Sequence, residues 1–231
     1  MVFQTSVAAK PAPYIEGGWT GFNPQYTLTN PDENQWVAGT PGPIVGRFAW
    51  GNVANGKVTS AHPGAPDVRI GFVHRDQNAI IAGLLLGDSN QVVAGQGIDL
   101  LADGPTAARF AAGVAKTGLK VYANYADGSC RAAASGSPAT QGSLTATTAN
   151  GSPNLTALSG TMPVAGQPIS GTGIAAGAYI VSVSGTTAVM SASATADGTG
   201  IAITKTLDFE TAWLTRSVCG NGETAKISVQ G

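Results

Sequence analysis

The sequence predicts an all-β protein: a β-barrel or sandwich-like domain with an extended N-terminal arm, one short helix and a small inserted β-sandwich-like domain. The first indication is that apolar and polar residues alternate in short runs. The second is that Asn-Gly and Asp-Gly pairs, which favour tight hairpins, separate some of these runs. The third is the content of 32 Gly and 13 Pro residues, which supply many turns. A chain of 231 residues can bury a substantial core without disulfides or metals.

Residues 1–30 are predicted to form the extended arm, because its prolines oppose helix and favour extended backbone. The arm carries several aromatic residues, which need a surface to lie on, either in the same chain or in a partner. The aromatic residues expected to contact a partner are Phe3, Tyr14, Trp19 and Phe22.

The main β-domain is expected to comprise residues 31–137 together with 206–231. Strand-like runs flank the hairpin signals Asn55-Gly56 and Asp127-Gly128. In the run "DVRIGFVHR", alternate residues from Val68 to His74 point to one face of the strand. Further strands are expected in "AIIAGLLL", "QVVAGQGIDLL", "FETAWLTRSV" and "AKISV". A short helix is predicted over Thr106–Lys116, since Ala107, Phe110, Ala111 and Val114 recur at helical spacing.

Residues 138–205 differ from the rest of the chain in composition. Between Pro138 and Thr204 the one charged residue is Asp197, and Gly-containing turns separate short β-runs. We interpret this segment as a small β-domain inserted into the first one and projecting outward. Cys130 and Cys219 flank the segment and form no metal-binding spacing, which favours reduced, buried thiols over a disulfide between neighbouring strands.

Several motifs resemble catalytic signatures without their required context. "GNVANGKV" lacks the Ser or Thr of a phosphate-binding loop and reads as a hairpin. His74-Arg75-Asp76 matches the start of a kinase catalytic loop, but the Asn expected five residues after the Asp is absent. His62 lies in a Pro-Gly turn, and His74 ends the apolar face of a strand, where a core or interface role is expected. We therefore predict no enzyme, no catalytic residues, no metal site and no cofactor.

The charge of the chain limits its partners. Charged residues make up 11%, against about 25% in an ordinary soluble domain, and the formal net charge is -1. Neither nucleic acid nor a membrane is expected as a partner, since no basic surface is indicated and the longest apolar run, residues 79–87, is too short to span a bilayer. A weakly charged surface fits a protein that packs against neighbouring chains.

Several stretches resemble, in the same order, the structural cement (capsid decoration) proteins of tailed bacteriophages. These are "MVFQTSVAAKPAPYIEGGWTGFNP", "VGRFAW" followed by "NGKVTSA", "GFVHRDQNAII" and "GLKVYANYADG", with a weaker match at 208–230. The segment 138–205 departs from shorter members and resembles a Gly/Thr-rich β-module of phage virion proteins.

The resemblance implies a virion protein, made in the host bacterial cytoplasm, that binds the outer surface of the capsid and bridges major capsid protein subunits. It also implies a homotrimer, with a dimer as the alternative. On this reading His74 and Arg75 join the arm aromatics as candidate partner-binding residues. A second hypothesis is a virion surface module that recognises a host glycan through the inserted domain.

Overall fold

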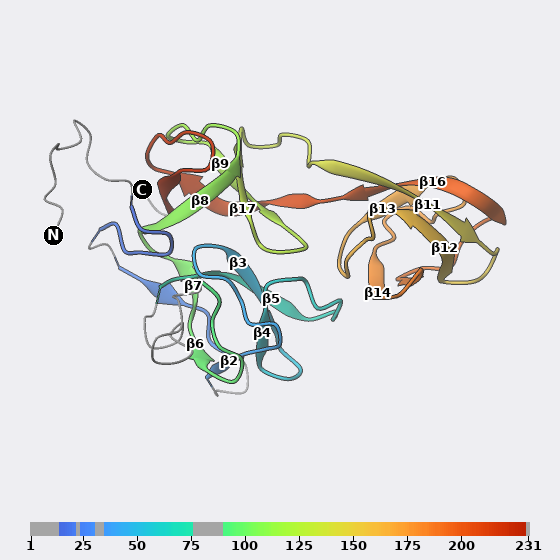
Figure 1. The fold of residues 1–231 in the computed structure, drawn as a ribbon, viewed down its shortest axis with the longest axis horizontal. Coiled ribbons are helices and arrows are strands. Elements are labelled where there is room, and N and C mark those ends of the chain that lie inside the picture. The colour runs from blue at the N-terminus through green and yellow to red at the C-terminus, as the bar shows by residue number, and fades with distance from the viewer. Residues whose placement is uncertain (1–13, 22–23, 31–34, 76–89, 230–231) are drawn as a thin grey trace, which may run out of the picture.

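The computed structural model describes residues 14–21, 24–30, 35–75 and 90–229. Within these residues every regular element is a strand, so the all-β prediction is confirmed. The strands form a seven-stranded sheet, a closed five-stranded barrel and a six-stranded sheet. Figure 1 shows the first two packed together at one end of the molecule and the third at the other end of the long axis.

The seven-stranded sheet has the order β1-β7-β5-β3-β4-β2-β6. Its pairs are antiparallel except for the parallel pair β2–β4. Asn55-Gly56 makes the turn between β3 and β4, as the hairpin signal predicts, and Gly56 has a φ of 66°. The strand bounds are Tyr26–Thr27 (β1), Trp36–Ala38 (β2), Phe48–Asn52 (β3), Lys57–Thr59 (β4), Val68–Val73 (β5), Gly97–Ile98 (β6) and Leu100–Asp103 (β7).

The barrel closes in the order β10-β8-β18-β17-β9. The hairpin predicted at Asp127-Gly128 joins its strands β9 and β10. The barrel shares a core with the seven-stranded sheet, because Phe48 and Phe72 pack on Trp213 at ring distances of 6.1 and 5.6 Å. Such aromatic pairs contribute about 0.5–1.5 kcal/mol each. The strand bounds are Thr106–Ala112 (β8), Lys120–Asn124 (β9), Cys130–Ala133 (β10), Asp208–Thr215 (β17) and Thr224–Ser228 (β18).

The predicted helix over Thr106–Lys116 is wrong. Its first part is the barrel strand β8, in which Ala108 and Phe110 are buried while Arg109 and Ala111 are exposed. β8 pairs with β18 on one side and with β10 on the other. Alanine-rich sequence fits the helical and the strand period equally well here, so pairing with two neighbours decides the structure.

The six-stranded sheet, order β13-β16-β11-β12-β15-β14, is formed by residues between the barrel strands β10 and β17. We call residues 141–206 the distal unit. It has a hydrophobic core of its own, built around Leu144, Leu155, Ile180 and Ile203. Its strands are Gln141–Thr148 (β11), Asn154–Gly160 (β12), Ile169–Gly171 (β13), Ile180–Ser184 (β14), Thr187–Met190 (β15) and Gly198–Thr206 (β16).

Candidate interaction surfaces

The described part of the arm pairs with the start of β8. The Gly17 amide donates to the Ala107 carbonyl at 2.8 Å, and the Ala107 amide donates back to the Gly18 carbonyl at 3.0 Å. An antiparallel bridge joins Trp19 to Thr106. The arm is therefore fastened to its own chain here by backbone hydrogen bonds.

His74 and Arg75 hold the arm from the other side, at the end of β5. The Arg75 amide donates to the Gly17 carbonyl at 2.8 Å, and its Nε donates to the Glu16 carbonyl at 3.1 Å. The ring of His74 packs on that of Trp19 with the centroids 5.1 Å apart. Two residues of the His-Arg-Asp triplet thus act as supports of the arm; the third, Asp76, lies outside the described residues.

The structure brings Trp19, His74 and Arg75 together, whereas the Tyr14 carbonyl accepts a bond from the Thr224 hydroxyl on β18, at 2.6 Å. The residues Trp19 and Tyr14 remain 40% and 46% exposed, so both have surface left for a partner. Phe3 and Phe22 lie outside the described residues, as does the strand expected in "AIIAGLLL".

The described residues offer no arrangement typical of catalysis. His62 Nδ1 accepts the Gly64 amide at 3.0 Å, its ring packs near Trp50 and Tyr125, and burial lowers the His62 pKa. Cys130 and Cys219 are buried free thiols, and burial raises the pKa of both. No group of three or more His, Cys, Asp or Glu in the described ranges is placed to hold a metal. None of the described segments forms a helix able to cross a membrane.

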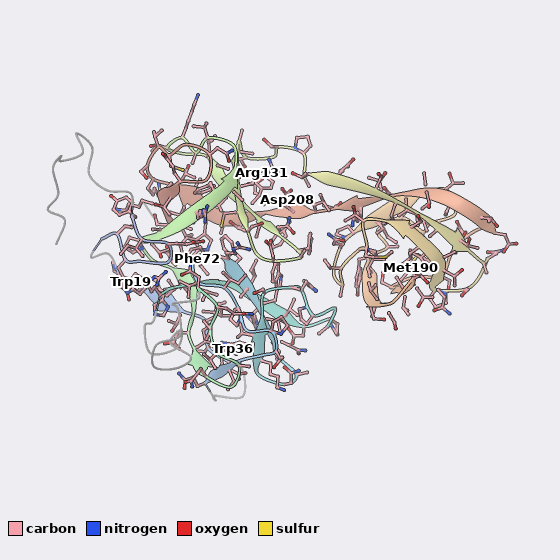
Figure 2. All side chains as sticks on the ribbon, viewed as in Figure 1. Trp19, Trp36, Phe72, Arg131, Met190 and Asp208 are labelled. Carbon is pink, nitrogen blue, oxygen red and sulfur yellow. The ribbon has the colours of Figure 1, made fainter. Side chains whose placement is uncertain are left out.

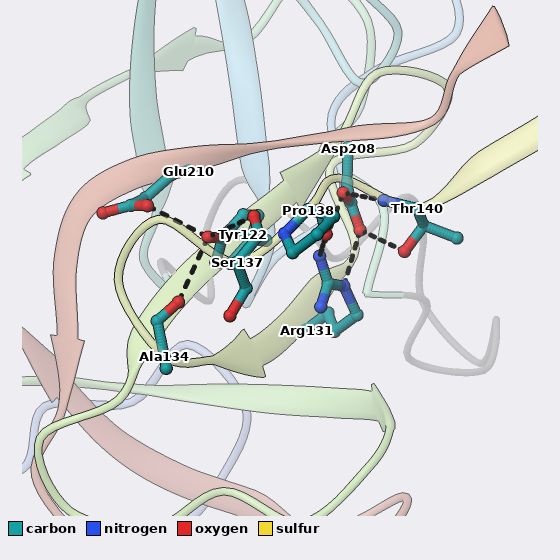
Figure 3. A network of polar contacts seen from close by, with 8 residues as sticks. All are labelled: Tyr122, Arg131, Ala134, Ser137, Pro138, Thr140, Asp208 and Glu210. Carbon is teal, nitrogen blue, oxygen red and sulfur yellow. Dashed lines mark hydrogen bonds and ion pairs between the residues drawn. The ribbon is translucent and has the colours of Figure 1, made fainter.

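A buried carboxylate ties the segment that leads into the distal unit to the barrel (Figure 3). Asp208, the first residue of β17, receives Arg131 Nε at 2.7 Å and Arg131 Nη2 at 3.1 Å. The Thr140 amide and hydroxyl each donate to the same carboxylate at 2.8 Å. Burial alone raises the Asp208 pKa, but these donors outweigh it, so the pKa is lowered overall.

Glu210 fixes residues 134–140, which lead from β10 into the distal unit. We call this segment, together with Arg131, Asp208 and Glu210, the junction. The Glu210 carboxylate accepts the Gly136 amide at 2.7 Å, the Ser135 hydroxyl at 2.8 Å and the Tyr122 hydroxyl at 2.9 Å. These donors lower the Glu210 pKa, the Gly136 amide most of all. The guanidinium of Arg131 also lies 4.4 Å from the centre of the Tyr122 ring. The segment that enters the distal unit is therefore fixed to β17, the barrel strand that follows the last strand of that unit.

A second contact joins the distal unit to the loop after β4. A Cβ added at Gly64 would lie 2.1 Å from the Val181 carbonyl oxygen, and one added at Gly166 would lie 2.3 Å from the His62 ring. Such distances require close packing of residues 61–66 against the distal unit. The junction and this contact together oppose rotation of the distal unit about its two connecting strands.

A polar cavity of about 280 Å³ lies on the solvent-facing side of β8. Separate segments supply its walls: the arm, the chain before β3, β8, the chain before β10, and the loop before β18. The Glu16 carboxylate accepts the Asn90 amide at 3.3 Å, and burial raises its pKa although Arg47, Arg109 and Arg75 lie nearby. The lining residues are Glu16, Arg47, Arg109, Ala111, Ser129 and Gly222.

One known protein family matches the sequence over nearly the whole chain. The sequence pattern of the XM1 gp53 minor capsid protein family matches residues 3–229. The chain belongs to this family. No curated protein matches the sequence. As a phage minor capsid protein the chain is a structural component of the virion capsid, which implies a structural rather than a catalytic role.

The side chains that form the junction and the cavity were not predicted from the sequence. Opposite charges on either side of the charge-poor segment, Arg131 before it and Asp208 after it, are the signal that points to the junction. The cavity had no such signal, because Glu16, Arg47 and Arg109 are far apart in the sequence and meet only through the arm and the barrel.

Proposed function

We propose that this minor capsid protein is a decoration, or cement, protein that binds the outside of the assembled head and stabilises the major capsid protein lattice. The observation that carries the proposal is that the molecule consists of two parts, a body and the distal unit. The barrel and the seven-stranded sheet form one body, which bears the arm residues, and the distal unit extends away from it (Figure 2). The collinear resemblance to decoration proteins supports the same reading.

In this proposal stabilisation arises by mass action. A protein that binds only the assembled, expanded lattice stabilises it by RT ln(1 + [L]/Kd) at each site. Modest contacts repeated over the shell then add up against internal pressure. The weakly charged surface suits such packing, because few charges lose their hydration when chains meet.

We propose that residues 31–137 with 206–231 face the capsid and that residues 138–205 are an inserted domain pointing away from it. Nearly all charged residues of the chain belong to the first body, whereas Asp197 is the one charge between Pro138 and Thr204. An insertion directed outward leaves the contact with the lattice unchanged. Trp19, His74 and Arg75 are the described residues proposed to lie nearest the shell, with Tyr14 beside them.

Binding to heads tests the proposal. Purified protein is sedimented with expanded heads that lack it, and with unexpanded heads as the control. We expect saturable co-sedimentation with the expanded heads alone. Absence of binding to expanded heads would refute the decoration role. Light scattering of the free protein tests the proposed homotrimer against a dimer.

Recognition of a host-surface glycan through the distal unit is a second candidate. It is favoured by the separate core of this unit and its weakly charged surface rich in Ser and Thr. The Leu207 amide donates to the Thr140 carbonyl at 2.8 Å, so an Asn-Gly turn can replace residues 141–206. If the unit serves host recognition, this variant keeps its head binding and loses binding to host cells. Unchanged cell binding would exclude the second candidate.

A further inference from the structure

The cavity beside β8 has unused hydrogen-bond donors. Arg109 donates its Nε to the Gly222 carbonyl at 3.0 Å, and within the described part of the chain no carboxylate lies within 4.0 Å of its guanidinium. Arg47 donates one Nη to Asp127 at 2.6 Å. The Ser129 amide is occupied by Asp127, which leaves the Ser129 hydroxyl as a further donor in the wall.

The charge of the site favours an anion with a single negative charge. Among the described residues that line the cavity, Arg47 is paired with Asp127, whereas the Arg109 guanidinium has no carboxylate within 4.0 Å. Arg109 is therefore the cation that an anion entering the cavity can pair with. A doubly charged phosphate would meet stronger repulsion from Glu16 than a carboxylate does, since Coulomb repulsion grows with the charge of the ligand.

The size and position of the cavity favour a side chain over a free small molecule. Its volume of about 280 Å³ lies at the lower limit for small-ligand pockets, about 300–1,000 Å³. Ala111 and Gly222 add an apolar part that can hold the methylene groups of a side chain. The cavity also adjoins the arm residue Glu16, on the body that we assign to the capsid contact.

We propose that this cavity binds the carboxylate of an Asp or Glu side chain presented by a neighbouring protein subunit of the capsid shell. The two Nη groups of Arg109 form the bidentate contact, and Arg47 and Ser129 complete the site. This proposal rests on the decoration role. It names a partner group that the decoration role by itself does not specify.

The isolated full-length protein tests the site with acetate as the probe. Acetate is titrated at constant ionic strength and neutral pH, and the amide resonances of Ser129 and Gly222 are followed by NMR. We expect saturable shifts that Arg109→Gln abolishes and that Glu16→Gln strengthens, because the latter removes a repelling charge. Arg69→Gln, an exposed arginine of β5, is the matched control and should leave the shifts unchanged.

Three results would overturn the site: no saturable shift, equal shifts in Arg109→Gln, or tighter binding of inorganic phosphate than of acetate. Head binding is measured in parallel. Arg109→Gln should weaken it about tenfold, as expected for a lost bond to a charged group, and Arg69→Gln should not. If acetate binds but Arg109→Gln binds heads normally, the capsid contact is refuted while the decoration role stands. If the native protein does not bind heads, the decoration role fails and acetate alone decides the site.

Discussion

Asp208 is the residue on which the junction depends most. It is 4% exposed, and its carboxylate accepts bonds from Arg131 and Thr140. Its pKa is lowered in the folded protein, so ionised Asp208 stabilises the fold above the unfolded-state pKa, about 3.9. This contribution is lost as the pH falls through the lowered pKa.

Asp208→Asn is therefore expected to lower the free energy of unfolding by about 1–3 kcal/mol at pH 7, because it removes charge-assisted bonds. Below about pH 4 the Asp208 carboxyl becomes protonated in the unfolded chain, and the native carboxyl follows at its lowered pKa, so the difference between the two proteins should shrink over this range. Urea unfolding across this pH range measures the effect. Asp99→Asn, at an exposed position, is the control. A difference that does not depend on pH would contradict the ionic role.

Gly17 determines how closely the arm approaches the sheet. Its φ is 74°, and an added Cβ would lie 2.4 Å from Val45 Cγ1. Gly17→Ala is expected to cost about 1–2 kcal/mol for the backbone conformation and about 1–3 kcal/mol more for the overlap. Gly95, with a φ of 87° and no atom within 4 Å of an added Cβ, provides the control. Equal thermal destabilisation of both alanine variants would show that the arm is not packed here.

Among the elements, local signals predicted the hairpins but not β8. Asn55-Gly56 and Asp127-Gly128 specify turns through a few adjacent residues, so no distant contact is needed. β8 is rich in Ala and has no turn signal of its own. Its pairing with β10 and with β18, more than 100 residues later, decides its conformation. Closure of the barrel is likewise a long-range property that sequence patterns do not contain.

The contact between the distal unit and residues 61–66 can be tested by a substitution at Gly64. Gly64→Ala is expected to displace this loop, because the added Cβ would lie 2.1 Å from the Val181 carbonyl oxygen. Hydrogen exchange of the loop amides should become faster, while exchange in the barrel strands stays unchanged. Gly177→Ala is the control, since its φ of 75° is similar but no atom lies within 4 Å of an added Cβ. Unchanged exchange in Gly64→Ala would mean that the contact does not hold the unit.

For the whole molecule, the change in composition at Pro138 predicted a segment of different character, and residues 141–206 have a core of their own. The packing of the arm did not follow from the sequence in the same way. Pro residues and aromatics indicated extended backbone and a need for contact, but not which surface the arm meets. That surface is formed by β5 and β8, whose adjoining ends are brought together only by the fold.

The proposed orientation predicts different effects for two exposed aromatic residues. Trp19→Ala, on the arm, should weaken head binding about tenfold, because exposed tryptophans often dominate protein interfaces. Tyr179→Ala, on the distal unit and 37% exposed, should leave head binding unchanged. Co-sedimentation of each variant with expanded heads measures both. A loss of binding in Tyr179→Ala alone would reverse the orientation.

Cryo-microscopy of the decorated head locates this protein on the capsid. We expect density on the outer surface of the shell, with the barrel and the seven-stranded sheet against major capsid protein subunits and residues 141–206 pointing into solvent. Density inside the shell, or density on the outside that contacts the shell through residues 141–206, would contradict this expectation.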